Sequence, residues 1–228
     1  MNDNIISRDV FLNKKRDFSP FLVHLTREGL DSSGDEIFSA RDVLYDFILS
    51  ERKLLACNYF CIFQEKVNSS SEEIKSKFKV VCFTETPIDQ IEVLLERVQG
   101  RNIILRPYGL VFKKEYIRQR GGNPVFYITG DLSSPLWTLF DNASKNDFPE
   151  VDCKVLALIN KCDEVIDFHW EREWRILGDF KFKLEDVFCG LCPEEEIKYF
   201  EDKYAPVIFI SPHWGINKIL DKLVNRNK

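Results

Sequence analysis

The amino-acid sequence predicts an α+β protein with a split, largely antiparallel sheet and flanking helices. Short apolar strands and helical segments follow one another irregularly, without the strict strand-helix alternation that produces a parallel sheet. Near the C-terminus, Phe180 and Phe182 alternate with lysines, as a hairpin partner strand would. No internal repeat or glycine-rich phosphate loop is visible in the sequence, which argues against a P-loop or dinucleotide-binding fold.

The chain divides into an N-terminal arm and one domain. Residues 1–17 are polar and mixed in charge, so we expect an arm or a loosely docked first turn there. From Pro20 the pattern becomes apolar, and residues 18–228 are expected to form a single α+β domain. A chain of 228 residues, of which 44% are hydrophobic, is long enough to bury one sizeable core.

Elements of the first half are predicted from apolar periodicity and from start and stop signals. Val43, Leu44, Phe47 and Ile48, for example, recur at helical spacing. The predicted elements are a strand at 21–26, a helix at 40–49 capped by Ser39 or Ser32, an apolar aromatic segment at 58–63, a loop with a helix start at 69–73, a strand at 78–83, and a helix at 88–98 opened by Pro87.

Elements of the second half follow from the same signals. The predicted elements are a strand at 108–112, a basic helix at 113–120 stopped by Gly121 and Gly122, a strand at 125–128, a helix at 135–140, a polar loop at 142–149, strands at 155–159 and 168–177, a segment at 184–188, a helix at 194–203, a strand at 207–210 and a last helix from 216.

The most informative stretch is residues 168–177, FHWEREWRIL. If it is a strand throughout, alternation places Glu171, Glu173 and Arg175 on one face and Trp170 and Trp174 on the other. Large aromatic rings beside a carboxylate exclude water and raise its pKa, so this stretch is a candidate site. The alternative is a sheet-edge strand in which a Glu/Arg pair lies over a tryptophan-rich core.

Two further strands carry polar side chains that suggest a site. His24 and Thr26 are two residues apart in the first strand and therefore share a face. Thr84 and Glu85 follow the strand at 78–83, at a position where polar side chains often meet a ligand. The structural alternatives are a core imidazole bonded to the backbone for His24, and an N-cap of the following helix for Thr84 and Glu85.

Charge and cysteine content restrict partners and compartment. The net charge of −5 provides no general attraction to nucleic acid, so such a contact would need a local basic surface. Seven cysteines, without a signal peptide or a long apolar run, indicate a reducing cytoplasm and no membrane segment. Cys189 and Cys192 form a CxxC without a second pair, so no metal is expected.

Four segments of the chain carry a resemblance to a known family. Residues 81–87 (VCFTETP), 108–114 (YGLVFKK), 121–127 (GGNPVFY) and 170–175 (WEREWR) together resemble the AbiGi-type abortive-infection proteins of bacteria. They also resemble broader families that share a Trp-x-x-Glu-Trp-Arg strand. These families are in turn distantly similar to ADP-ribosyltransferases, including toxins that modify DNA or RNA, and this implies an ADP-ribosyltransferase-like fold.

The resemblance implies roles for several residues. Glu173 would be the catalytic acid, and Glu171 would be a second acid that activates the acceptor. His24 and Thr26 would hold ribose hydroxyls and the carboxamide region of NAD⁺, which is consumed as a substrate. The acceptor would be a macromolecule such as RNA or DNA, and an antitoxin or another partner encoded nearby would accompany the chain.

The middle motif departs from the pattern of the resembled enzymes. Thr84 and Glu85 stand where related enzymes have a Ser-Thr-Ser or aromatic-rich segment, and with Arg175 they complete the implied NAD⁺-binding set. The residue that stacks on the nicotinamide therefore stays open, with Tyr59 and Tyr108 as candidates.

Two other classes of function stay open. The chain is alternatively the non-enzymatic, antitoxin-like half of a toxin–antitoxin pair, with a transferase-like fold. A metal-dependent nuclease would use Glu171 and Glu173 with an aspartate such as Asp167 or Asp179, but no lysine stands two residues after either glutamate.

Overall fold

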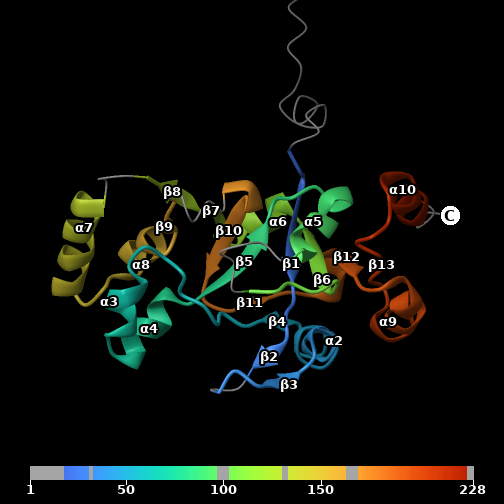
Figure 1. The fold of residues 1–228 in the computed structure, drawn as a ribbon, viewed down its shortest axis with the longest axis horizontal. Coiled ribbons are helices and arrows are strands. Elements are labelled where there is room, and N and C mark those ends of the chain that lie inside the picture. The colour runs from blue at the N-terminus through green and yellow to red at the C-terminus, as the bar shows by residue number, and fades with distance from the viewer. Residues whose placement is uncertain (1–17, 31–32, 97–102, 130–132, 163–168, 225–228) are drawn as a thin grey trace, which may run out of the picture.

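The computed structural model describes residues 18–30, 33–96, 103–129, 133–162 and 169–224. Its centre is a seven-stranded sheet with the strand order β13-β12-β6-β1-β5-β10-β7 (Figure 1). Every neighbouring pair in this sheet is antiparallel except β12 and β13, which are parallel. The prediction of a mixed α and β protein with a largely antiparallel sheet and flanking helices is therefore confirmed.

The strands fall into the main sheet and three small ladders. The main sheet contains β1 (Phe21–Leu25), β5 (Val80–Thr84), β6 (Gly109–Lys113), β7 (Asn123–Pro124), β10 (Glu173–Leu177), β12 (Val187–Leu191) and β13 (Phe209–Ile210). The ladders pair β2 (Gly29–Leu30) with β3 (Glu36–Phe38), β4 (Lys53–Leu54) with β11 (Phe180–Lys181), and β8 (Phe126–Ile128) with β9 (Ile159–Lys161).

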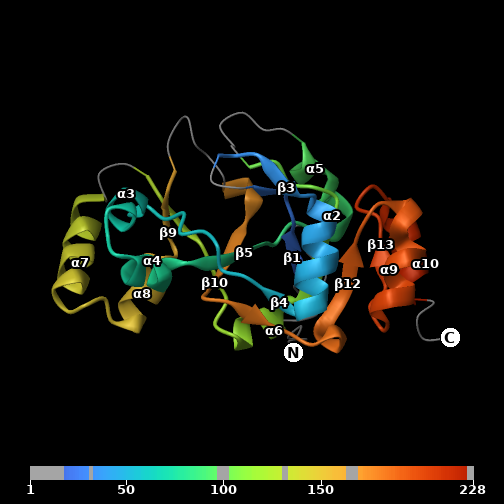
Figure 2. The ribbon, with the colours of Figure 1, turned by 90° about the horizontal axis from the view of Figure 1, so that it is seen from below.

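Helices lie at both ends of the sheet and on both of its faces. At the β10 end lie α3 (Gln64–Asn68), α4 (Glu72–Phe78), α7 (Ser133–Lys145) and α8 (Glu150–Leu156), and at the β13 end lie α9 (Ile197–Tyr204) and α10 (Ile216–Val224) (Figures 1 and 2). The others are α2 (Ala40–Asp42), which continues as the π-helix η1 (Val43–Leu49), α5 (Glu92–Leu95), α6 (Lys114–Gln119), and the 3₁₀ turns η2 (Ile88–Gln90), η4 (His169–Glu171), η5 (Leu184–Asp186) and η6 (Glu194–Glu196).

Local sequence signals start the helices as expected. Ser39 accepts a hydrogen bond from the backbone of Asp42, whose side chain reaches back to the Ser39 backbone in a capping box. Ser71 caps α4 in the same way, accepting from the Ile74 backbone. Each such cap contributes about 1 kcal/mol to helix stability.

The core lies on the two faces of the sheet. We call the face that bears Leu22, Phe83 and Trp174 face A; it packs on η1, α6, α9 and the β4/β11 ladder. We call the other face, which bears Val23 and Cys82, face B. One half of face B packs on α5 and α10, and the half near β10 packs on α3, α4, α7 and α8.

Several element boundaries differ from the sequence prediction. Residues 155 and 156 end α8, a turn follows, and β9 begins only at Ile159, so 155–159 is not a strand; α7 runs into the predicted polar loop. The segment at 180–182 pairs through β11 with β4 and not with its neighbour β10, because Gly178 turns the chain at φ +76°. The predicted arm at 1–17 and the end of the helix at 88–98 lie outside the described residues.

The largest correction concerns residues 168–177. His169–Glu171 form a 3₁₀ turn, Arg172 has φ +46°, and the strand begins only at Glu173. Because the left-handed Arg172 interrupts the alternation, Glu171 does not share a strand face with Glu173 and Arg175. Residue 168 lies outside the described residues.

Among the helices of the described residues, none combines the length and the apolar character that crossing a bilayer requires.

Candidate functional site

The sheet parts between its two central strands, β1 and β5. Their ladder has a single register pair, Val23 with Thr84, whereas β5 pairs with β10 along its whole length. Beyond this pair the His24 side chain replaces the backbone as hydrogen-bond donor, because its Nδ1 lies 2.8 Å from the carbonyl oxygen of Cys82. A side chain thus satisfies a backbone acceptor where the ladder would otherwise do so.

His24 is a neutral, oriented imidazole. Burial is the main cause that lowers the pKa of His24; the charge of Arg27 lowers it further, and the hydrogen bond to Cys82 opposes both. Since a carbonyl only accepts, Nδ1 carries the proton and Nε2 is left as an acceptor. The ring lies on face A, edge-on to Phe83 at 5.8 Å between centroids.

On face B, Glu173 and Arg175 form a bidentate ion pair. Arg175 Nε lies 2.8 Å from Glu173 Oε1, and Arg175 Nη2 lies 2.9 Å from Glu173 Oε2. Its third nitrogen, Nη1, donates to the Ala157 carbonyl at the end of α8 at 2.8 Å. The Arg175 side chain is 1% exposed and that of Glu173 is 14% exposed, so the carboxylate is the part of the pair that reaches the surface.

Tyr127 and His169 border this carboxylate. The Tyr127 hydroxyl donates to Glu173 Oε2 at 3.1 Å, and the Tyr127 ring lies 4.8 Å from the His169 ring. Burial raises the pKa of Tyr127 well above its usual range, and the charges of Glu173 and, to a smaller extent, Glu171 raise it further. Tyr127 therefore stays protonated as a hydrogen-bond donor, with both acids close to it.

Cys82 connects the two sides of the sheet. Its carbonyl accepts from His24, while its thiol lies on face B beside Glu173 and Arg175. Burial raises the pKa of the Cys82 thiol well above its usual value, and Glu173 adds to the effect. The thiol is consequently protonated at neutral pH and is not a nucleophile.

Thr84 and Glu85 bind the protein itself. The Thr84 hydroxyl donates to the Glu171 carbonyl at 2.5 Å, and the Glu85 backbone N–H donates to the Arg172 carbonyl at 3.1 Å. The Glu85 carboxylate, on face A, pairs with Lys114 and accepts from Trp174 Nε1 at 2.8 Å. Neither residue is an N-cap of the η2 turn, which follows Pro87 without a side-chain cap.

Thr26, Tyr108 and Tyr59 lie apart from the Glu173 carboxylate. Thr26 is buried and its hydroxyl lies 3.0 Å from the Ala40 carbonyl and 3.2 Å from the Tyr108 carbonyl. Burial raises the pKa of Tyr108 to about 12, and its ring packs near Phe200 of α9. The Tyr59 hydroxyl donates to Asn68 at 2.8 Å.

The predicted set is thus brought together only in part. One cluster contains Glu173, Arg175 and the end of the turn that holds Glu171. His24 is connected to this cluster only indirectly, because it bonds to the Cys82 carbonyl while the Cys82 thiol lies beside Glu173. Tyr127 and His169 belong to the cluster but were not predicted. Tyr127 is placed by the parallel pairing of β8 with β9, for which the local sequence carries no signal.

The acids of the nuclease alternative do not all meet. Asp167 lies outside the described residues. Asp179 lies beyond the opposite end of β10 from Glu173, where it accepts from the Ala56 backbone at 2.9 Å. Within the described part of the chain, no three His, Cys, Asp or Glu side chains are grouped as metal ligands would be.

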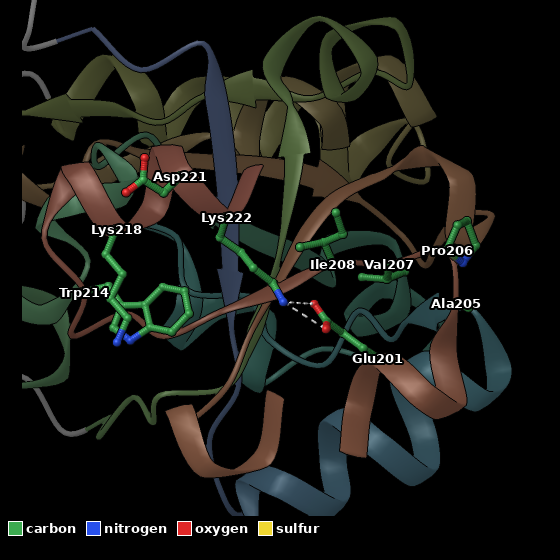
Figure 3. A pocket seen from close by; sticks show the side chains of 9 residues that line it. All are labelled: Glu201, Ala205, Pro206, Val207, Ile208, Trp214, Lys218, Asp221 and Lys222. Atoms are coloured by element: carbon green, nitrogen blue, oxygen red, sulfur yellow. Dashed lines mark hydrogen bonds and ion pairs between the residues drawn. The ribbon is translucent and has the colours of Figure 1, made fainter. Parts of the chain in front are cut away.

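A hollow of about 660 Å³ opens at the other end of the sheet (Figure 3). It lies between α9, α10 and the segment before β13, and Lys222 crosses it to pair with Glu201 at 3.0 Å. Lys218, on the same side, pairs with Glu194 at 2.6 Å. Its lysines are neutralised within the protein, so we place the candidate site at the Glu173 carboxylate and not in this hollow.

Comparisons of the chain with family models, with curated proteins and with solved structures gave no match. The site is therefore interpreted from its own chemistry and from the resemblance of its sequence motifs.

Proposed function

We propose that this protein is an NAD⁺-dependent ADP-ribosyltransferase of bacterial phage defence, with an ADP-ribosyltransferase-like fold and Glu173 as its catalytic carboxylate. The observation that carries the proposal is the Glu173 side chain, 14% exposed and held by Arg175 on one side and by the Tyr127 hydroxyl on the other. The WEREWR motif that carries the resemblance contains this residue.

The chemistry needs a fixed carboxylate. The bond between nicotinamide and ribose C1′ breaks with its electron pair leaving on nicotinamide, through an oxocarbenium-like ribose. A carboxylate held beside the ribose stabilises the developing positive charge, and one preorganised interaction of this kind supplies about 3–4 kcal/mol. An acceptor oxygen or nitrogen then bonds to C1′ and gives its proton to Glu171 or to water.

The neighbouring groups suit the remaining parts of NAD⁺. Tyr127 and His169 provide aromatic surface for the nicotinamide next to Glu173. His24 is left out of this site, because its imidazole lies on face A with Phe83, whereas the Glu173 carboxylate lies on face B. Thr26, Tyr108 and Glu85 are removed from the proposed NAD⁺-binding set, because their side chains are directed to other parts of the protein.

The acceptor in this proposal is a macromolecule, RNA or DNA, in the bacterial cytoplasm. The test incubates the protein with labelled NAD⁺ and separate pools of total RNA, single-stranded DNA and cell extract. The Glu173→Gln variant keeps the shape of the side chain and removes its charge. Glu196→Gln is the matched control, because Glu196 also pairs with an arginine, Arg41, through both oxygens at 3.1 and 3.2 Å.

Transfer by the wild type and by Glu196→Gln, but not by Glu173→Gln, supports the proposal and identifies the acceptor pool. Equal transfer by Glu173→Gln would reject Glu173 as the catalytic residue. If the wild type neither transfers label nor releases nicotinamide nor binds NAD⁺, the enzymatic proposal fails.

One observation favours a second function, that of a non-enzymatic partner in a toxin–antitoxin pair. Both Glu173 oxygens already have partners within the chain, which is also what a purely structural ion pair requires. This function predicts a stable complex with a protein encoded by a neighbouring gene, and no NAD⁺ binding. Co-expression and co-purification of the two proteins distinguish it from the enzyme.

A further inference from the structure

The turn that precedes Glu173 has an unusual backbone. Arg172 has φ +46°, a left-handed conformation that side chains with a Cβ rarely adopt. Such a residue persists only where surrounding contacts determine it. Within the turn, the Arg172 N–H donates to the His169 carbonyl at 3.1 Å, so the remaining support must come from elsewhere in the fold.

The last residue of β5, Thr84, and the residue after it, Glu85, supply that support. The Thr84 hydroxyl donates to the Glu171 carbonyl at 2.5 Å, and the Glu85 N–H donates to the Arg172 carbonyl at 3.1 Å. Thr84 Oγ1 is itself oriented, because it accepts from the Thr86 backbone at 3.1 Å. The carbonyls on both sides of the left-handed residue are therefore bonded to the end of β5.

The Glu85 side chain anchors the residue that follows Glu173. Its carboxylate accepts from Trp174 Nε1 at 2.8 Å and pairs with Lys114, whose side chain is 17% exposed against 11% for Glu85. The start of β10 is thus held on both faces, by Glu85 through Trp174 on face A and by Arg175 through Glu173 on face B.

We propose that Thr84 and Glu85 are positioning residues: they hold the left-handed turn at Arg172 and thereby set the place of Glu173 and its distance from Glu171. We call the two hydrogen bonds from Thr84 and Glu85 to this turn the clamp. The effect of the clamp on catalysis rests on the proposed function, but the clamp itself is a property of the fold. If the strand continued through Arg172, alternation would place Glu171 on the same strand face as Glu173. In the structure, Glu171 instead belongs to the 3₁₀ turn before the strand and lies near Tyr127.

The first measurement is limited trypsin cleavage after Arg172, whose side chain is exposed in the wild type. Thr84→Val keeps the shape and removes the hydroxyl, and Thr84→Ser keeps the hydroxyl. We expect Thr84→Val to increase the cleavage rate at Arg172 at least about fivefold, as the loss of one buried hydrogen bond implies. Thr84→Ser should stay within about twofold of the wild type, and mass spectrometry of the 1–172 fragment isolates this bond from all others.

The second measurement is steady-state NAD⁺ turnover by the same variants. A positioning role lowers kcat about tenfold or more in Thr84→Val, with KM for NAD⁺ unchanged and with rescue by Thr84→Ser. Glu85→Gln keeps the backbone N–H but weakens the hydrogen bond that Trp174 donates. It should also lower kcat with KM unchanged, but by a smaller factor than Thr84→Val.

The outcomes separate the two proposals. Unchanged cleavage at Arg172 in Thr84→Val, or acceleration that is equal at every tryptic site, overturns the clamp. Faster cleavage with unchanged kcat overturns its positioning role. If the wild type has no turnover, the proposed function fails, and the cleavage pattern alone decides whether the clamp exists.

Discussion

The imidazole of His24 donates to the carbonyl oxygen of Cys82 at 2.8 Å, at the point where β1 separates from β5. The Cys82 thiol lies on the other face, beside Glu173 and Arg175. Two side chains that the sequence suggested as one site, His24 and Glu173, therefore lie on opposite faces and are joined through a third residue. Replacing either should perturb the other mainly through β5.

Replacing His24 tests the value of its hydrogen bond. His24→Phe leaves the Cys82 carbonyl without its donor, and we expect a loss of about 1–3 kcal/mol in the free energy of unfolding. His24→Asn retains a donor and should lose less. Urea denaturation of both variants measures the difference, and equal losses would show that packing alone accounts for the effect.

The lowered pKa of His24 predicts a pH dependence of stability. The folded state binds the proton more weakly than the unfolded state, whose pKa is near 6.5, so the unfolded state carries more protons below this value. The free energy of unfolding should therefore fall as the pH drops below about 6.5 and be constant with respect to this group above it. In His24→Asn this part of the dependence should disappear from urea titrations at pH 5 to 8.

Arg175 is the group whose loss should cost most at the site. Arg175→Leu leaves Glu173 without its ion-pair partner and the Ala157 carbonyl without its donor, and we expect a loss of about 3–5 kcal/mol. Glu173→Gln retains an acceptor for Arg175 and should cost clearly less. A double variant, Glu173→Leu with Arg175→Leu, should recover part of the stability; a double variant as unstable as the sum would contradict coupling of the two charges.

The thiols should differ in their reactivity toward a disulfide reagent. Cys57 is exposed, whereas Cys61, Cys153, Cys162, Cys189 and Cys192 are buried, and burial raises the pKa of the partly buried Cys82. Only the thiolate reacts, so the native protein should show a single fast-reacting thiol. Cys57→Ser should remove the fast phase, and a fast thiol that peptide mapping assigns to Cys82 in that variant would show that β5 opens in solution.

Local patterns predicted much of the fold. Strand β1 and strand β6 follow from short apolar runs, and α2 and α4 begin at the serines whose side chains cap them. These features depend on neighbours a few residues away, and such interactions can be read from the sequence. The Glu173–Arg175 pair belongs to the same group, because residues two apart in a strand share a face.

The rest of the site was decided by contacts between distant segments. The sequence by itself determined that Glu173 and Arg175 meet, that the helices start where they do and that the sheet is largely antiparallel. Only the tertiary structure placed Tyr127 beside Glu173, separated Glu171 from its strand and put His24 on the other face. The reason is physical. The turn at Arg172 is hydrogen-bonded to Thr84 and Glu85, and Thr84 and Glu171 are 87 residues apart in the sequence. No periodicity within residues 168–177 can predict hydrogen bonds to such distant residues.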